Sequence, residues 1–148
     1  MPLSESQFSA LKQAAVAASK NAWCPYSSFR VGAAILAADG QIFAGCNVEN
    51  ASHGLTICAE RNAIGQAVAA GCRDFTALLI FTATERPTAP CGACRQVVAE
   101  FAPKIDVIGI CDGAEEIRAS MQELLPKSFG PHSLEPASKL GQASELAE

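Results

Sequence analysis

The sequence predicts an α/β fold in which helices cover both faces of one mixed five-stranded sheet, a three-layer α/β/α sandwich. The first observation is a hairpin, because residues 31–37 and 41–48 read as strands on either side of the turn Asp39-Gly40. The second is a pair of continuous apolar runs, 75–82 and 105–111, which are typical of strands buried on both faces. Each run follows a helical segment, and this order implies a mixed sheet with helices on both sides.

The N-terminal half supplies two helices around the hairpin. Ser4 to about Ser19 reads as a helix that starts with a capping box, since Gln7 stands three residues after Ser4. A polar loop, 49–57, follows the hairpin. A second helix is predicted to begin near Cys58 and to end at Gly71.

The C-terminal half alternates strands and helices. A third helix is predicted from Pro90-Cys91 to near Phe101, then a short strand around Ile117 and a short helix, 121–125. We expect residues 1–135 to form a single domain. Residues 136–148 are polar and without periodicity, and we expect them to be a flexible tail.

Composition excludes several classes of function. The chain has 148 residues, a net charge of −4 and 6% aromatic residues, so it lacks the basic, aromatic footprint of a nucleic-acid-binding protein. No apolar stretch reaches the roughly 20 residues of a membrane span, and we see no signal peptide. Seven cysteines, an odd number, favour metal-binding thiols in a reducing compartment over disulfides, so we expect a cytoplasmic protein.

The most informative residues are three cysteines and one glutamate. Cys58-Ala59-Glu60 is followed, about 30 residues on, by Pro90-Cys91-Gly92-Ala93-Cys94. Three thiolates suit one zinc ion and leave its fourth tetrahedral position free for a water, which is a catalytic arrangement. Glu60 lies two residues from a ligand and can reach that water without binding the metal. This pattern predicts a hydrolytic deaminase in which Glu60 carries protons.

Helix geometry and charge balance add further expectations about these residues. Both clusters lie at predicted helix N-termini, which lower thiol pKa values, and the spacing of Cys91 and Cys94 predicts that both sulfurs share one helical face. At position i+2 of a regular helix Glu60 would point away from Cys58, so Cys58 must lie at an irregular helix start. Since three thiolates outweigh one zinc ion by one charge, we expect Arg61 and Arg95 to offset the excess.

Two other interpretations of the cysteines remain open at this point. The pair Cys91 and Cys94 alone resembles a thioredoxin-like redox pair. A structural zinc module is the second alternative, with His53 as its fourth ligand. The remaining cysteines are expected to be small buried hydrophobic residues: Cys24, Cys46, Cys72 and Cys111.

The motifs resemble those of a known family. Cys58-Ala59-Glu60-Arg61 and the segment from Pro90 to Gln96 are similar to the two zinc motifs of cytidine deaminase, in its small three-cysteine form. The resemblance covers roughly residues 5 to 135, because three more segments match in order: 24–34, 45–51 and 123–129.

The resemblance implies a five-stranded α/β sandwich and a homotetramer whose sites are shared between subunits. It implies zinc-dependent deamination of cytidine and 2'-deoxycytidine to uridine and 2'-deoxyuridine, a step of pyrimidine salvage. It also implies one zinc per chain on Cys58, Cys91 and Cys94, with Glu60 as the proton shuttle. The other residues implied in the site are Asn47 and Glu49 on the sugar hydroxyls, Phe29 on the pyrimidine, the backbone of Ala59 on the base, Phe129 in a neighbouring subunit's site, and Arg61, Arg95 and Pro90 around the ligands. Alternation along a strand would place positions 47 and 49 on one face.

One departure from the family pattern concerns substrate choice. Where the family often carries an aromatic residue such as tyrosine, this chain has His53. A histidine there would change the pH dependence or substrate preference, or it is a neutral substitution in a polar loop. The rival within the fold is a deaminase of another aminopyrimidine, such as a blasticidin-S-type nucleoside. Asn47 and Glu49 favour a ribose-bearing substrate over that rival.

Overall fold

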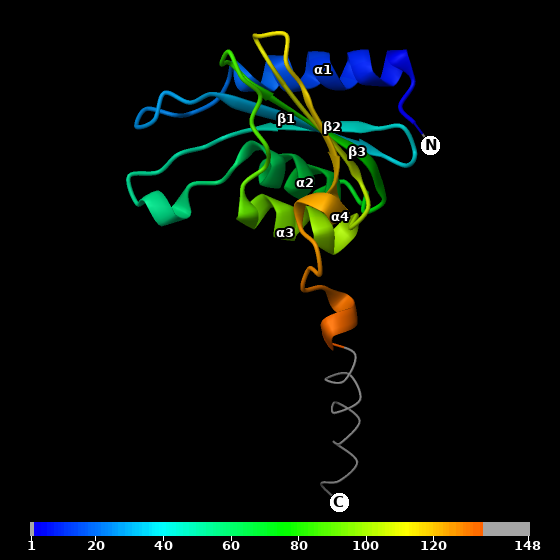
Figure 1. Cartoon of the computed structure of the whole chain (residues 1–148). Helices are drawn as coiled ribbons and strands as arrows, with labels where there is room; N and C mark the ends of the chain where they lie inside the picture. The colour runs from blue at the N-terminus through cyan, green and yellow to red at the C-terminus, as the bar shows by residue number, and fades with distance from the viewer. Residues whose placement is uncertain (1, 135–148) are drawn as a thin grey trace, which may run out of the picture.

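The protein is described here by a computed structural model that covers residues 2–134. It contains a five-stranded sheet in the order β2-β1-β3-β4-β5 (Figure 1). β3 and β4 run parallel, and the other neighbouring pairs run antiparallel, so the predicted mixed sheet is confirmed. The strands are β1 (Val31–Ala37), β2 (Ile42–Cys46), β3 (Phe75–Thr82), β4 (Asp106–Cys111) and β5 (Ile117–Ser120).

Helices cover both faces of the sheet, which confirms the three-layer arrangement. The helix α1 lies on one face, and α2, α3 and α4 lie on the other (Figure 1). The helices are α1 (Glu5–Ser19), α2 (Ala59–Ala69), α3 (Gly92–Phe101) and α4 (Met121–Leu124), with short 3-10 turns η1 (His53–Leu55) and η2 (Pro131–Leu134).

Alternation along the central strands builds two cores. Ile35 and Leu78 point into the core under α2 and α3, whereas their neighbours Leu36 and Leu79 point into the core under α1. All four side chains are buried, as expected for strands covered on both sides. The sheet therefore gives α2 and α3 a rigid common platform.

The predicted helix signals match the structure at the first two helices. Ser4 caps α1 with a full capping box to Gln7. Gly71, beyond the end of α2, has a φ of +89°, a left-handed conformation that glycine adopts without strain.

The hairpin differs from its prediction at the far end of the second strand. β2 ends at Cys46, so the predicted strand, 41–48, is two residues too long at this end. The reason is that the chain pairs here with segments outside the sheet. Val48 forms isolated bridges with Trp23 and Ile57.

Two further expectations concern the C-terminal tail and membrane-spanning segments. The predicted tail, 136–148, lies outside the described residues. Within residues 2–134, no helix is both long enough and apolar enough to cross a lipid bilayer.

Candidate metal centre and active site

Three thiols meet where α2 and α3 begin. Cys58 is the N-cap of α2, and Cys91 is the N-cap of α3; both have extended backbone conformations. Cys94 follows in the first turn of α3. The three sulfur atoms lie within 4.8 Å of one another, and the Cys58 and Cys91 sulfurs are 3.8 Å apart. The chain folds so that two cysteines 33 residues apart become neighbours.

The geometry confirms two predictions. Cys58 lies outside the regular helix, as required for Glu60 to share its site. Cys91 is the N-cap of α3 and Cys94 is its third residue, and their sulfurs meet on one side of the helix start, as the three-residue spacing predicts. These are the two positions that a capping box brings together.

The donor set fits zinc. Three thiol sulfurs at two helix N-termini are soft ligands in a positive electrostatic field, which favours their thiolate forms. Cys94 is fully buried, whereas Cys91 is exposed, so the cluster opens to solvent on one side. Among residues 2–134 no fourth side chain joins the cluster, and the structure does not bring His53 to it as a ligand. This arrangement does not support the structural zinc module.

Glu60 is a buried carboxyl beside these sulfurs. It occupies the first turn of α2 and is only 5% exposed. Burial raises the pKa of Glu60 above its ordinary value, and the negative charge of Cys58 raises it further. A carboxyl that holds its proton more strongly than usual is suited to exchange protons with a reacting group.

The Arg61 guanidinium contacts the cluster directly. Its Nη2 atom donates to the Cys58 sulfur at 3.5 Å and to the Thr56 carbonyl at 3.3 Å. The pKa of Cys58 is lowered to about 5, first by a hydrogen bond from the Cys94 thiol and then by Arg61. The pKa of Cys94 is raised, because that thiol donates its proton to Cys58.

Arg95 makes different contacts from those expected for it. Its Nε atom donates to the Pro90 carbonyl at 2.7 Å, and its Nη1 atom donates to the Leu124 carbonyl at 2.8 Å. Pro90 is itself buried. Arg95 therefore fastens the backbone before Cys91 to the end of α4, whereas the sulfur contact comes from Arg61.

The predicted sugar-binding residues are joined by hydrogen bonds to the segment 26–31. The Asn47 side chain is 8% exposed; its Nδ2 atom donates to the Phe29 carbonyl at 2.7 Å, and its Oδ1 atom accepts from the Val31 amide at 2.9 Å. Glu49 Oε1 accepts from the Tyr26 and Ser27 amides at 3.0 and 3.2 Å. These bonds bring Phe29, Asn47 and Glu49 into one neighbourhood.

The side chains of Ser27, Tyr26 and His53 also belong to this neighbourhood. A hydrogen bond from the Ser27 hydroxyl is the main cause of the lowered pKa of Glu49. The His53 ring lies edge-on to Tyr26, with ring centroids 5.4 Å apart, so the position singled out in the sequence lies beside this group. Sequence reasoning missed Tyr26, although it lies in the matching segment 24–34.

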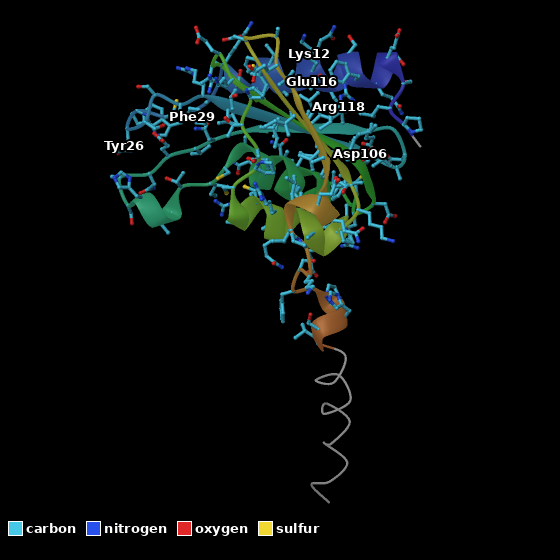
Figure 2. All side chains as sticks on the ribbon, viewed as in Figure 1. Lys12, Tyr26, Phe29, Asp106, Glu116 and Arg118 are labelled. Atoms are coloured by element: carbon cyan, nitrogen blue, oxygen red, sulfur yellow. The ribbon has the colours of Figure 1, made fainter. Side chains whose placement is uncertain are left out.

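The candidate site lies at one end of the molecule. In Figure 2, Tyr26 and Phe29 lie together at one end, and Asp106, at the start of β4, lies at the other. A cavity of about 570 Å³ at that second end is lined by Phe75, Phe101 and Asp106 among others, and by none of the predicted site residues. We therefore base the site on the cysteine cluster and not on this cavity.

Phe129 is held by its backbone while its ring is exposed. The Phe129 carbonyl accepts from Gln96 Nε2 at 2.9 Å, and the residue is 61% exposed. The segment beyond α4 runs below α3 and away from the sheet (Figure 1). Gln96 is a residue that sequence reasoning did not assign a role, although it stands in the second zinc motif.

The other cysteines follow the prediction only in part. Cys24 is buried, as expected. Cys46, Cys72 and Cys111 are partly exposed, because they lie at the ends of strands or helices where packing is incomplete. The expectation of full burial is wrong for these three.

Comparison with known proteins agrees with this geometry. Residues 5–110 match the family described as the cytidine and deoxycytidylate deaminase zinc-binding region. A cytidine deaminase of Halalkalibacterium halodurans is 48% identical over 118 residues, which cover 78% of this chain and 88% of the relative. A crystal structure of cytidine deaminase from Burkholderia pseudomallei superimposes with a TM-score of 0.79 at 45% identity, covering 86% of this chain and all of that one. A blasticidin-S deaminase of Bacillus cereus is less similar, at 31% identity over 107 residues, 67% of this chain and 76% of that protein.

Proposed function

The chain belongs to the cytidine deaminase family, and on this premise we propose that it hydrolyses cytidine and 2'-deoxycytidine to uridine and 2'-deoxyuridine. The observation that carries the proposal is the meeting of three thiols with one buried carboxyl, Glu60, at the start of two helices. A thioredoxin-like redox pair would leave the third thiol, Cys58, and Glu60 without a role.

Cys58, Cys91 and Cys94 would hold the metal. Zinc, when bound by three protein ligands, activates a water molecule as a nucleophile at neutral pH. Arg61 partly offsets the negative charge of the three thiolates through its hydrogen bond to the Cys58 sulfur. Arg95 holds the Pro90 carbonyl and so fixes the backbone that presents Cys91.

Glu60 moves the protons of the reaction. It accepts the two protons of the attacking water in turn, the second from the hydroxyl group that the attack has added to the carbon. It delivers one to the ring nitrogen of the pyrimidine and the other to the amino group, which leaves as ammonia. Water is thereby added at the amidine carbon, the carbon–nitrogen bond breaks, and a carbonyl remains. The raised pKa of Glu60 supports this role, because a proton carrier works best when its pKa lies near the operating pH.

Four residues would hold the nucleoside. The Ala59 amide lies at the N-terminus of α2, where backbone donors are free of helical partners, and it would bind the base carbonyl. The exposed face of Phe29 would pack on the pyrimidine. Glu49 keeps its second oxygen for a sugar hydroxyl, and Asn47 keeps its second amide hydrogen.

Assembly and cellular role complete the proposal. The exposed ring of Phe129 supports a homotetramer in which this ring enters a neighbouring subunit's site. Residues 1–135 would form the single domain of each subunit. The free thiols support a cytoplasmic enzyme of pyrimidine salvage.

The experiment is a deamination assay with cytidine and 2'-deoxycytidine on protein whose zinc content is measured in the same preparation. About one zinc per chain with turnover of either nucleoside would establish the reaction. One zinc per chain without turnover of either nucleoside would contradict the proposal. Blasticidin S would then be the next substrate to test, because of the Bacillus cereus relative, and His53 the first residue to replace.

A further inference from the structure

We propose that Arg95 and Gln96 are positioning residues that fix the segment from Leu124 to Phe129, here called the C-terminal arm, and thereby hold Phe129 in place for the substrate. The inference rests on the proposed function in one respect, the role of Phe129. It goes beyond that function because it assigns the placement of the arm to two neighbouring side chains of α3.

The two side chains hold the arm at both ends. Arg95 Nη1 donates to the Leu124 carbonyl at 2.8 Å, and Gln96 Nε2 donates to the Phe129 carbonyl at 2.9 Å. Both donors come from adjacent residues of one helical turn. A segment bound at its first and last residue by one rigid helix has little freedom to move relative to that helix.

The arm itself is irregular, which makes these bonds necessary. Leu125 leaves the helical conformation at the end of α4, Pro126 has no amide hydrogen to donate, and Lys127 has a φ of +53°, a left-handed conformation that is uncommon outside glycine. A backbone of this kind has no helical partners for its carbonyls, which are left to side chains or water. Arg95 and Gln96 supply that contact at both ends of the arm.

The same helical turn also carries one of the proposed metal ligands. Cys94 directly precedes Arg95, and Arg95 Nε donates to the carbonyl of Pro90, the residue before Cys91. One side chain therefore contacts the backbone that presents a metal ligand and the backbone that presents Phe129. The backbone of the arm is thus tied to the helical turn that carries the cysteines of the same chain.

The exposure of Phe129 indicates what this placement serves. Burying a phenylalanine side chain stabilises a protein by roughly 1.5–3 kcal/mol, yet Phe129 is 61% exposed while its carbonyl accepts a hydrogen bond from Gln96. A ring held outward in this way is placed for a contact beyond its own chain. In the proposed function that contact is the nucleoside in a neighbouring subunit.

The test replaces Gln96 with glutamate, which keeps the size of the side chain but removes the donor to the Phe129 carbonyl. We expect KM for cytidine to rise about fivefold, the equivalent of one hydrogen bond, with kcat and zinc content nearly unchanged. Gln66→Glu is the matched control, because Gln66 Nε2 donates to the Ala44 carbonyl at 2.8 Å from α2, away from the arm. This control should leave KM unchanged.

A double-mutant cycle identifies the residue through which Gln96 acts. In a Phe129→Ala background, Gln96→Glu should have no further effect on KM. An undiminished effect in that background would overturn the inference, because Gln96 would then act by another route. Wild-type KM in Phe129→Ala would remove the proposed role of Phe129, and the inference with it.

Limited digestion with trypsin tests the arm without any assay of activity. Cleavage after Lys127, followed by mass spectrometry, measures how often the arm opens, and Gln96→Glu should raise its rate about fivefold. The Gln66→Glu control should be cut at the wild-type rate. Equal rates in all three proteins would overturn the inference even if the enzyme acted on another nucleoside, so its failure is distinguishable from that of the proposed function.

Discussion

The helices α2 and α3 both start at a cysteine N-cap, yet they are supported in different ways. The first turn of α2 is buried, and Gly45 of β2 lies so close that an added Cβ atom would come within 2.5 Å of the Ala63 nitrogen. The first turn of α3 is open, and an added Cβ atom at Gly92 would meet no atom within 4 Å. α2 is fixed by the sheet, whereas the start of α3 is fixed by side-chain hydrogen bonds.

Because of this difference, the two helices contribute to the site in different ways. α2 brings one thiol and the carboxyl Glu60 into a rigid, water-poor position, which suits the group that handles protons. α3 brings one exposed thiol, Cys91, and one buried thiol, Cys94, and Arg95 connects this end of the helix to the C-terminal arm. The account therefore predicts that replacing Glu60 or Arg61 of α2 affects the chemistry while zinc stays bound, and that changes at the start of α3 affect metal binding and substrate contact.

The largest effect is expected from removal of a metal ligand on α3. Cys94→Ala should abolish stoichiometric zinc binding and turnover, because two thiols cannot replace a three-ligand site. Cys24→Ala is the control, since Cys24 is also a buried cysteine but lies outside the cluster, and it should keep about one zinc per chain. Metal analysis after gel filtration measures both variants. Full zinc content in Cys94→Ala would exclude the proposed ligand set.

The next-largest effect is expected from removing the positive charge of Arg61 beside the sulfurs. Arg61→Gln should lower kcat/KM about 10- to 100-fold while zinc remains bound, because outer-shell partners of metal ligands tune the site by this amount. Arg118→Gln serves as the control, since its ion pair with Glu116 is exposed and worth little. Unchanged turnover in Arg61→Gln would show that the thiolate charge is offset in another way.

A smaller effect tests the contact between β2 and α2. Gly45→Ala should destabilise the fold by about 1–3 kcal/mol, because the new methyl group would collide with the backbone of α2. Gly92→Ala should change stability by no more than about 0.5 kcal/mol. Urea unfolding of both variants measures the difference. Equal free energies of unfolding for the two variants would mean that α2 packs no more tightly against its neighbours than α3 does.

Much of the fold was readable from local patterns. The bounds of β3 follow from a continuous apolar run, and those of β1 were predicted beside the turn Asp39-Gly40. The start of α1 follows from Ser4 and the end of α2 from Gly71, because these signals depend only on neighbouring residues. The end of β2 could not be predicted, because it is decided by the pairing of Val48 with Trp23 and Ile57. Contacts between distant segments leave no periodic signal in the sequence.

The candidate site shows the same limit. Three cysteines suited to one zinc ion were enough to predict the cluster, and helix geometry was enough to predict the irregular start at Cys58. The partners of Arg95 were not predictable from its position beside Cys94, because the Leu124 carbonyl arrives from a segment 29 residues away. Gln96 was missed for the same reason, since its partner is the backbone of Phe129.

The most direct test of the division between α2 and α3 is the turnover of Glu60→Gln at known zinc content. The substitution keeps the size of the buried side chain and removes its ability to carry protons. We predict about one zinc per chain, because the three thiols are intact, together with a fall in kcat of about 10²- to 10⁴-fold. Normal turnover of cytidine by zinc-loaded Glu60→Gln would contradict the account.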